Sequence, residues 1–342
     1  MRGEGAGSSA AVGGVARAAI RAAARPLLLC AGLAVVGYLI WDLGPGAIWD
    51  AFARLSWRVL VVLVFPAWLV VFLDTLGWRF TFTRPPRSLF HLAAVRLAGE
   101  AVNTSTPTAS VGGEPVKAFL LRPEIPTRDA LVSVIADKTT VVASQVILLA
   151  VGLLASLVFV PLSHPLMLTM TALLALQTVC AAGFVFMQLG GVIGGGGRLM
   201  TRLGMTPNVS QAALEGLDRA LRSTYVERWR RLLASTLYHF SASALETLEI
   251  YLVVLFLGLR MPVAAALGIG AFGNAVRFFS FMIPGNVGVL EGANVALFAA
   301  FGIAGPIAFT CTLAQRLREI LWTAAGFAAA SLLSARLTPR RG

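Results

Sequence analysis

Residues 103–121 read NTSTPTASVGGEPVKAFLL and interrupt a chain that otherwise consists of long apolar segments. Pro107 breaks a helix because it lacks a backbone N–H donor, and Glu114 and Lys117 place charge of both signs close to that break. An ionised side chain at the centre of a membrane helix costs roughly 2.5–3.5 kcal/mol on insertion scales. Irregular backbone at membrane depth is tolerated only where protein or a water-filled cavity surrounds it. The stretch therefore predicts a broken helix beside an enclosed polar space.

The composition places the whole chain in a membrane. Its 342 residues are 57% hydrophobic and 13% charged, with a mean hydropathy of +0.80, whereas a soluble domain carries about 25% charged residues. The three cysteines lie within apolar runs and form neither a disulfide framework nor a CxxC metal motif. The sequence also lacks the GxxxxGKS or GxxxxGKT phosphate loop of ATP-driven proteins. We expect an all-α polytopic membrane protein without a cofactor or a metal site.

Apolar segments divide the chain into membrane elements. Two stretches, 88–121 and 262–302, are broken near the middle by Pro107 and Pro284. Because their legs are too short to cross a bilayer alone, each is predicted to enter and return as a re-entrant helical hairpin. The predicted fold is six transmembrane helices plus these two hairpins. The six helices, which need about 20 residues each, are expected at 27–42, 57–80, 130–160, 166–190, 232–258 and 306–334.

Basic residues are distributed unequally between the two faces that this layout creates. The net charge is +12, and one face receives only Arg54, Arg58 and Arg260, while the other receives most of the remaining arginines. By the positive-inside rule, both termini are expected in the cytoplasm, with the chain in a bacterial inner membrane. Nucleic acid is not an expected partner because the sequence offers no soluble basic domain for it.

The two broken stretches match each other in sequence. GEAVNTSTPTASVGGEPVKAFLL starts at Gly99 and GNAVRFFSFMIPGNVGVLEGANVALF at Gly273, and each places a glutamate seven residues after its proline, at Glu114 and Glu291. Counting spans, the two units start on opposite sides of the membrane, as inverted repeats do in many transporters with a site near the midplane. The expected division is one membrane domain at 1–335, holding repeats at about 57–160 and 229–335 and a cytoplasmic loop at about 193–228, and a tail at 336–342.

Charged residues gather around both predicted hairpins, where each needs a partner or a cavity. Asp137 and Lys138 point about 100° apart on a helix and need partners elsewhere, whereas Arg316 and Glu319 can pair locally. We expect Asp137 or Lys138 to approach the charged cluster at 316–319, or Arg277, across the pseudo-two-fold. These charges serve either substrate binding or interhelical salt bridges. The candidates for substrate binding are Glu114, Lys117, Asp137, Lys138, Arg277, Glu291, Arg316, Arg318 and Glu319.

Other residues receive a structural interpretation. Asp74, Glu246 and Glu249 are interpreted as structural or gating residues. The three histidines, His91, His164 and His239, are scattered, and no acid follows any of them at a catalytic spacing. The backbone geometry of the hairpins is expected to require Pro107, Gly112, Gly113, Pro284, Gly285 and Gly288.

Four motifs resemble the lysylphosphatidylglycerol synthase transmembrane family, and most closely its hopanoid-biosynthesis-associated branch. They are the stretch 99–121 quoted above, VIADKTTVVASQ at 134–145, FMIPGNVGVLEGANVALF at 281–298 and LAQRLREILW at 313–322. The resemblance implies a lipid flippase, in which a headgroup passes through a central cavity while the tails stay in the bilayer. The implied substrate is a phospholipid, a polyisoprenyl-phosphate-linked lipid or a hopanoid-type lipid. On family grounds Asn103 joins the substrate-binding candidates. The full set of residues that the resemblance carries over is Asn103, Gly112, Gly113, Glu114, Asp137, Lys138, Pro284, Gly285, Gly288, Glu291, Arg316 and Glu319.

Two departures from the family limit what the resemblance implies. Multidomain relatives carry a C-terminal aminoacyltransferase domain, and we do not expect synthase activity from this chain. Lys117 and Lys138 stand where arginine is commoner in the family, which weakens an expectation of bidentate phosphate binding.

Two other classes of function remain open. The chain could be a non-transporting membrane partner of lipid-biosynthesis enzymes. It could also be an intramembrane lipid-modifying enzyme, although the sequence has no nucleophile beside a base and no metal-ligand spacing. The oligomeric state is not indicated.

Overall fold

A computed structural model describes residues 29–106, 112–159, 163–191, 210–280 and 283–337. Throughout these ranges the regular structure is helical, without a β-strand. The all-α class expected from the sequence is therefore confirmed. The helices are Leu29–Leu43, α2 (Pro45–Leu55), α3 (Arg58–Thr81), α4 (Leu89–Ser105), α5 (Gly113–Leu121), α6 (Thr127–Phe159), α7 (His164–Leu189), α9 (Gln211–Glu227), α10 (Trp229–Phe256), α11 (Val263–Phe279), η1 (Pro284–Asn286), α12 (Val289–Ala300) and α13 (Gly305–Leu337).

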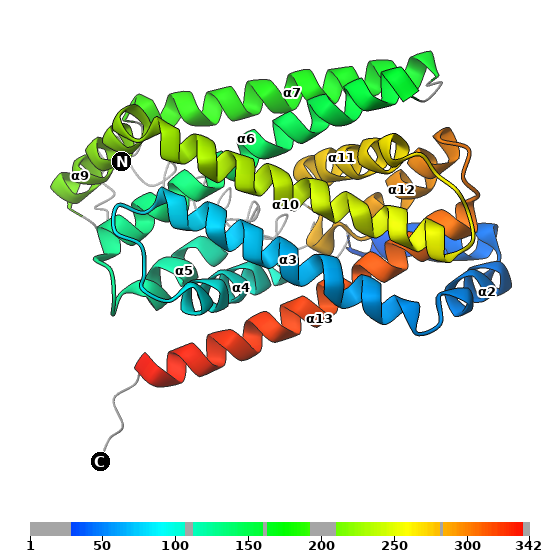
Figure 1. The fold of residues 1–342 in the computed structure, drawn as a ribbon, viewed down its shortest axis with the longest axis horizontal. Coiled ribbons are helices and arrows are strands. Elements are labelled where there is room, and N and C mark those ends of the chain that lie inside the picture. Colours follow the sequence, from blue (N-terminus) through cyan, green and yellow to red (C-terminus); the bar gives the residue numbers. More distant parts are fainter. Residues whose placement is uncertain (1–28, 107–111, 160–162, 192–209, 281–282, 338–342) are drawn as a thin grey trace, which may run out of the picture.

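The longest helices run lengthwise through the molecule (Figure 1). Among the described residues, α3, α6, α7 and α10 are long and apolar enough to cross a membrane, and these four candidates coincide with four of the expected spans. Leu29–Leu43 and α2 are bent by 88° relative to each other and together form a fifth, broken candidate. A 33-residue helix, α13, occupies the place of the sixth expected span. It carries charges of both signs and is not among the candidates, so the sixth span stays a prediction.

Two pairs of short helices lie at the positions of the predicted hairpins. α4 packs against α5, and α11 packs against α12. In Figure 1 the first pair lies in the half of the molecule nearer α9, and the second pair lies in the half nearer α2. Pro284 begins the short turn η1 between α11 and α12, whereas Pro107 falls outside the described residues. That each pair returns to the side of the bilayer from which it starts stays a prediction.

Packing between the two halves of the chain is reciprocal. Among the described helices, α3 and α10 share the most extensive contact. α4 packs against α13, and α11 packs against α6. The first helix of each short pair therefore contacts the long helix that follows the other pair, and polar residues from both halves meet at the centre.

Two glycines allow very close approaches at the breaks. A Cβ on Gly113 would overlap the backbone carbonyl of Gly99 on α4. Gly288 has a φ of +83°, and a Cβ there would lie 2.6 Å from the carbonyl oxygen of Gly32. At both positions the close approach of another backbone leaves no room for a Cβ.

The other two hairpin glycines differ from each other. Gly285 has a φ of +60°, a left-handed conformation that favours glycine. Gly112 has a φ of −64° and a ψ of −28°, which any residue other than proline adopts readily. The chain therefore enters α5 at Gly112 in ordinary helical geometry, and the expectation that the hairpin requires glycine at this position stays a prediction.

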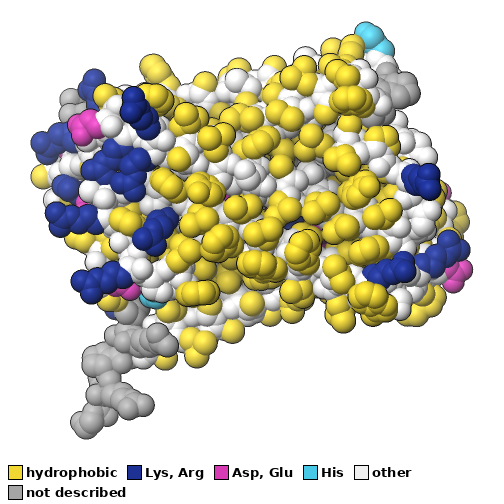
Figure 2. Space-filling model, in the orientation of Figure 1, with side chains coloured by type: hydrophobic (Ala, Val, Ile, Leu, Met, Phe, Trp, Pro, Cys, Tyr) yellow, Lys and Arg dark blue, Asp and Glu magenta, His cyan; other side chains and the backbone are white. Residues whose placement is uncertain are grey.

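The surface is apolar along the middle and charged at the ends. Figure 2 shows hydrophobic side chains over the middle of the visible face and basic side chains gathered at the end where α9 lies, with a smaller group at the end of α2. Large side chains such as Phe65, Phe186 and Leu332 are exposed. An apolar surface of this kind is what a bilayer covers.

Candidate functional site

A polar cavity of about 350 Å³ lies between the two halves of the molecule. Side chains from α3, α4, α5, α6, α10, α11 and α13 line it. Its described lining includes His239, six carboxylates and five cationic groups. The carboxylates belong to Asp74, Glu100, Glu114, Asp137, Glu246 and Glu319, and the cationic groups to Arg96, Lys117, Lys138, Arg277 and Arg318.

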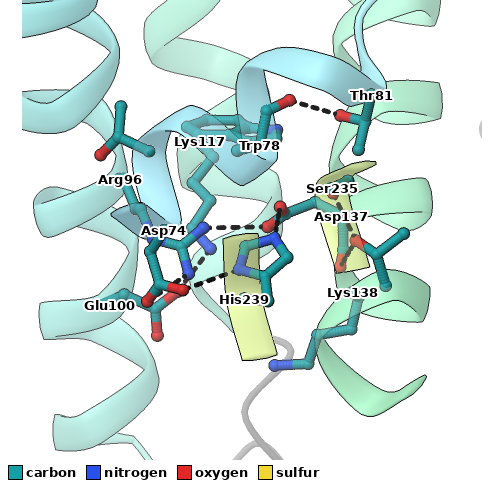
Figure 3. A network of polar contacts seen from close by, with 12 residues as sticks. Asp74, Trp78, Thr81, Arg96, Glu100, Lys117, Asp137, Lys138, Ser235 and His239 are labelled. Carbon is teal, nitrogen blue, oxygen red and sulfur yellow. Dashed lines mark hydrogen bonds and ion pairs between the residues drawn. The ribbon is translucent and has the colours of Figure 1, made fainter. Parts of the chain in front are cut away.

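Four of these residues form a closed set of contacts, which we call the aspartate ring: Asp74, Arg96, Asp137 and His239. Arg96 bridges the two aspartates, with one nitrogen 3.1 Å from Asp74 Oδ2 and another 3.1 Å from Asp137 Oδ2. His239 bridges their other oxygens, with Nδ1 2.7 Å from Asp74 Oδ1 and Nε2 2.9 Å from Asp137 Oδ1. In Figure 3 the imidazole lies between the two carboxylates. The ring joins α3, α4, α6 and α10.

Beside the ring, α4 and α5 meet through a second set of charges. Lys117 Nζ lies 2.6 Å from Glu100 Oε1 and 3.2 Å from Glu114 Oε2. The Lys117 side chain is only 2% exposed, and its ammonium also lies 5.7 Å from the centre of the Trp78 ring. Lys117 is therefore saturated with partners, and its charge serves to hold α4 against α5.

Asn103, on α4, forms hydrogen bonds with the first residues of α5. Its Oδ1 accepts a hydrogen bond of 2.7 Å from the backbone N–H of Gly113, at the start of α5. Its Nδ2 donates to Glu114 Oε1 at 3.2 Å. Because the first N–H groups of a helix have no partner within that helix, Asn103 satisfies one of them from the preceding helix. Asn103 thus links the two legs of the pair rather than being free for a ligand.

Lys138 differs from Lys117 in how tightly it is held. Its Nζ lies 3.8 Å from Glu114 Oε1, and its side chain is 26% exposed. Lys117 and Lys138 are the only two lysines in the chain, and both line this cavity. Lys117 is buried between its carboxylate partners, whereas Lys138 is exposed enough to bind a further anion.

The second half of the chain supplies a matching set of charges. Arg318 lies 3.1 Å from Glu249 Oε2 and 3.6 Å from Glu246 Oε1, which ties α13 to α10. Arg277 reaches Glu319 Oε1 at 3.7 Å and has a side chain that is 37% exposed. Arg277 is therefore the loosely held cation of this half, as Lys138 is of the other.

Arg316 serves the break between α11 and α12. Its guanidinium donates to the carbonyl oxygen of Gly285 at 2.7 Å and to Glu291 Oε1 at 2.8 Å. Glu291 Oε2 in turn accepts from the backbone N–H of Gly288 at 2.7 Å. Arg316 also pairs with Glu319 at 3.0 Å, as their spacing predicted. These contacts position the start of α12, and neither Arg316 nor Glu291 lines the polar cavity.

A second cavity, mainly apolar, opens beside the polar one. Its volume is about 440 Å³, and its lining comes from the end of α4, the turn η1 and α13. It shares Thr104, Glu319 and Thr323 with the polar cavity. The polar space and the apolar space are therefore adjacent, with three lining residues in common.

The structure brings together most of the charged residues that the sequence singled out. Asp137 and Lys138 find separate partners, as expected, and line the same cavity as Arg277, Arg318 and Glu319. The direct ion pairs of Asp137 and Lys138, however, are with residues of α4, α5 and α10 rather than with Arg277 or the cluster at 316–319.

Sequence reasoning missed Arg96 and Glu100 and gave His239 too little weight. Arg96, Glu100 and Asn103 follow a spacing of four and then three residues on one face of α4, in an otherwise apolar segment. Ionisable residues in such a segment are signals of a polar site in their own right. The partners of His239 are 165 and 102 residues away in the sequence, so the spacing of neighbouring residues could not predict these contacts.

Metal binding has no support within the described ranges. They contain no group of three or more histidine, cysteine, aspartate or glutamate residues arranged to hold a metal ion. In the aspartate ring Arg96 and His239 occupy the sides of the two carboxylates on which a cation would have to sit.

Comparisons with known proteins place the chain in a family. A family model described as the lysylphosphatidylglycerol synthase TM region matches residues 24–326. A UPF0104 membrane protein of Methanothermobacter thermautotrophicus is 24% identical over 308 residues, covering 85% of this chain and 90% of that protein. A UPF0104 membrane protein of Pyrococcus horikoshii is 23% identical over 317 residues, covering 85% and 91%. The comparison with solved structures gave no match. This chain is therefore a membrane protein that belongs to the family of the lysylphosphatidylglycerol synthase transmembrane region.

Proposed function

We propose that this protein is a flippase that carries a phosphate-bearing lipid between bilayer leaflets through its polar cavity. The observation that carries the proposal is that a polar cavity of about 350 Å³ lies directly beside an apolar one of about 440 Å³, with three lining residues in common. A lipid needs both, because its headgroup is polar and its tails are not. A volume of this size lies within the range of small-molecule sites, roughly 300–1,000 Å³.

The phosphate would lie between Lys138 and Arg277. Both face the polar cavity, one from each half of the chain, and both are partly exposed. Their ion pairs are long, at 3.8 and 3.7 Å, whereas Arg96, Lys117 and Arg318 each have two carboxylate partners, with the nearest at 3.1 Å or less. A cation whose carboxylate partner is distant gives up little interaction energy when it turns to a phosphate. The charge-assisted hydrogen bonds that it then forms are stronger than hydrogen bonds between neutral groups.

The cavity also favours headgroups that carry an amine. The side chains of Glu100 and Glu246 line it and are partly exposed. A headgroup with a phosphate and an ammonium would meet cations and carboxylates in one space. A hopanoid without a phosphate would leave Lys138 and Arg277 unused, so within the substrates considered the charges favour phospholipids and polyisoprenyl phosphates.

The fold supports movement between leaflets. The two short helix pairs lie in opposite halves of the molecule (Figure 1), and the helices pack reciprocally across the centre. That is the arrangement of inverted-repeat transporters, in which one repeat rocks against the other around a fixed site. The end rich in basic side chains (Figure 2) is then the cytoplasmic end, in a bacterial inner membrane.

Binding of a defined lipid tests the site. We would titrate dioctanoyl phosphatidylglycerol, and in parallel dioctanoyl phosphatidylethanolamine, into the purified protein and into the K138Q/R277Q variant. The matched control is R128Q/R260Q, which removes the same charge from two exposed positions outside the cavity. Each charge-assisted hydrogen bond contributes roughly 1.5–3 kcal/mol, so we expect the affinity of the cavity variant to fall at least about tenfold, with the control unchanged.

Chemical protection provides a second readout of the same site. Because Lys117 is buried, an amine-reactive reagent should modify Lys138 first among the two lysines. Bound phosphatidylglycerol should slow that modification. Equal affinities in all three proteins, with no protection of Lys138, would contradict the proposal and favour the non-transporting partner of lipid-biosynthesis enzymes.

A further inference from the structure

We infer that the aspartate ring is a proton-binding site, in which His239 holds an exchangeable proton whose occupancy is linked to that of the cavity. The linkage rests on the proposed function, because it needs an anionic group at Lys138 and Arg277. The proton site itself rests only on the geometry of Asp74, Arg96, Asp137 and His239.

The hydrogen-bond geometry indicates how many protons the two ring nitrogens of His239 carry. A neutral imidazole has one N–H donor and one nitrogen lone pair, whereas an imidazolium has two donors. His239 presents Nδ1 to Asp74 Oδ1 at 2.7 Å and Nε2 to Asp137 Oδ1 at 2.9 Å, and an ionised carboxylate can only accept. A neutral His239 would therefore direct one lone pair at a carboxylate oxygen, and an imidazolium satisfies both contacts.

The proton resides on the imidazole rather than on a carboxylate. Histidine is the stronger base, with an ordinary pKa of about 6.5 against about 3.9 for aspartate. The guanidinium of Arg96 also donates to Asp137 Oδ2 and forms an ion pair with Asp74 Oδ2, so each carboxylate has a positive charge beside it. With the proton in place, the two carboxylates balance Arg96 and His239, and the aspartate ring is neutral.

The ring is enclosed and reaches the cavity on one side. The His239 side chain is 1% exposed, and its imidazole packs against Gly77, where a Cβ would lie 2.8 Å from Nε2. Asp74 is the more exposed aspartate and lines the cavity. Because His239 and Asp74 both line the cavity, a proton can pass between the imidazole and the cavity directly or through Asp74.

The surrounding charges decide the sign of the linkage. On the α4, α5 and α6 side, Glu100 and Glu114 face Lys117 and Lys138 and balance them. On the α10, α11 and α13 side, the cavity-lining carboxylates of Glu246 and Glu319 equal in number the cavity-lining cations of Arg277 and Arg318. Outside the lining, Glu249 also pairs with Arg318, and Arg316 also pairs with Glu319. The described lining is thus neutral with His239 protonated and carries one net negative charge without that proton. An anionic headgroup binds better in the protonated state, so by linkage it also favours proton binding.

Nitrogen NMR of a single-histidine protein tests the proton site. The chain has three histidines, and H91Q/H164Q leaves His239 alone without touching the aspartate ring. The full chain with 15N-labelled histidine in detergent should give the signals of two protonated ring nitrogens at pH 7. A neutral imidazole at pH 7, with one unprotonated nitrogen, would overturn the inference.

A second substitution tests whether the carboxylate of Asp137 is what keeps His239 protonated. In the same background, Asp137→Asn supplies an amide N–H donor toward Nε2, so the ring no longer needs the extra proton. We expect His239 to become neutral at pH 7 in that variant. If His239 stays protonated at pH 7 in the D137N variant, its protonation does not depend on the two carboxylates of the aspartate ring, which contradicts the inference.

The linkage is tested by adding dioctanoyl phosphatidylglycerol to the single-histidine protein during a pH titration. Linked sites change each other's affinity by roughly 5- to 150-fold, so the pH at which His239 loses its proton should rise by about one unit. A protonated His239 with no shift would keep the proton site and overturn its linkage to the lipid. The same titration with K138Q/R277Q should give no shift, which separates failure of the proposed lipid site from failure of the proton site.

Discussion

At the scale of single residues, the two lysines illustrate how burial separates two roles. Lys117 contacts two glutamates and a tryptophan ring while fully enclosed, whereas Lys138 is partly open to the cavity with one distant partner. Removing one member of a buried ion pair leaves an uncompensated charge and costs about 3–5 kcal/mol.

We therefore predict that K117M strongly lowers the stability of the protein in detergent, by about 3–5 kcal/mol. K138Q should change stability by less than about 1 kcal/mol, since a partly exposed pair contributes little, yet lower the affinity for phosphatidylglycerol. Denaturant unfolding and lipid titration on the same samples measure both effects. Equal loss of stability in the two variants would contradict the division of roles.

Asn103 leads to a prediction about the break itself. N103A removes the acceptor of the Gly113 N–H, and a buried unsatisfied donor costs about 1–3 kcal/mol. N103D keeps an acceptor but adds a negative charge beside Glu100 and Glu114. Hydrogen exchange should show faster exchange at the start of α5 in N103A. Unchanged exchange there would indicate that Asn103 does not hold the break.

How much of the site the sequence predicts depends on how far apart the partners lie. The pairing of Arg316 with Glu319 follows from three-residue spacing on one helix. The aspartate ring does not follow from spacing, because its members come from four helices and the paired residues are separated by 22 (Asp74 to Arg96) to 165 (Asp74 to His239) positions in the sequence. Only the tertiary fold shows that Asp137, His239 and Arg96 meet.

At the scale of elements, glycines determine where the short helices begin. We predict that G113A and G288A each lower stability by more than about 2 kcal/mol, because overpacking alone costs roughly 1–3 kcal/mol and Gly288 adds a left-handed conformation. G292A is the matched control, since Gly292 lies within α12 with no atom within 4 Å of a Cβ there. It should be neutral or slightly stabilising, because alanine favours a helix. Thermal unfolding in detergent compares the three, and a G113A or G288A protein as stable as G292A would contradict the close packing.

The helices themselves were largely predictable, because apolar length alone identifies α3, α6, α7 and α10. The breaks were predictable from proline and glycine. The conformation at Gly112 was not, because glycine permits a left-handed turn without requiring one. The status of α13 was also not predictable from length, since its centre carries three charges that pair with α10, α11 and α12.

At the scale of the whole molecule, charge asymmetry predicts orientation. In a protein with Cys30, Cys180 and Cys311 replaced by serine, we expect a cysteine at Arg222 on α9 to react with a membrane-impermeant thiol reagent only from the cytoplasmic side. A cysteine at Asp50 on α2 should react only from the opposite side, because these elements lie at opposite ends of the molecule (Figure 1). Labelling of intact and permeabilised cells distinguishes the sides. Both cysteines reacting from one side would refute the predicted orientation.

Tyr225 shows how α9 is fastened to the membrane helices. Its hydroxyl donates to Gln188 on α7 at 2.6 Å and lies 2.8 Å from the hydroxyl of Thr139, next to Lys138 on α6. Burial raises the pKa of Tyr225 to about 12, so the phenol stays a neutral donor at physiological pH. The end of the molecule that we place in the cytoplasm is therefore joined to the helix that carries a cavity lysine.

The most direct test of the central claim is lipid translocation in proteoliposomes. Fluorescently tagged phosphatidylglycerol that reaches the outer leaflet is quenched by an impermeant reductant, so the quenched fraction reports movement between leaflets. We predict faster movement with the protein than in protein-free liposomes, a rate near that background for K138Q/R277Q, and an unchanged rate for R128Q/R260Q. Movement by K138Q/R277Q at the wild-type rate, or no movement above background by the wild type, would contradict the account.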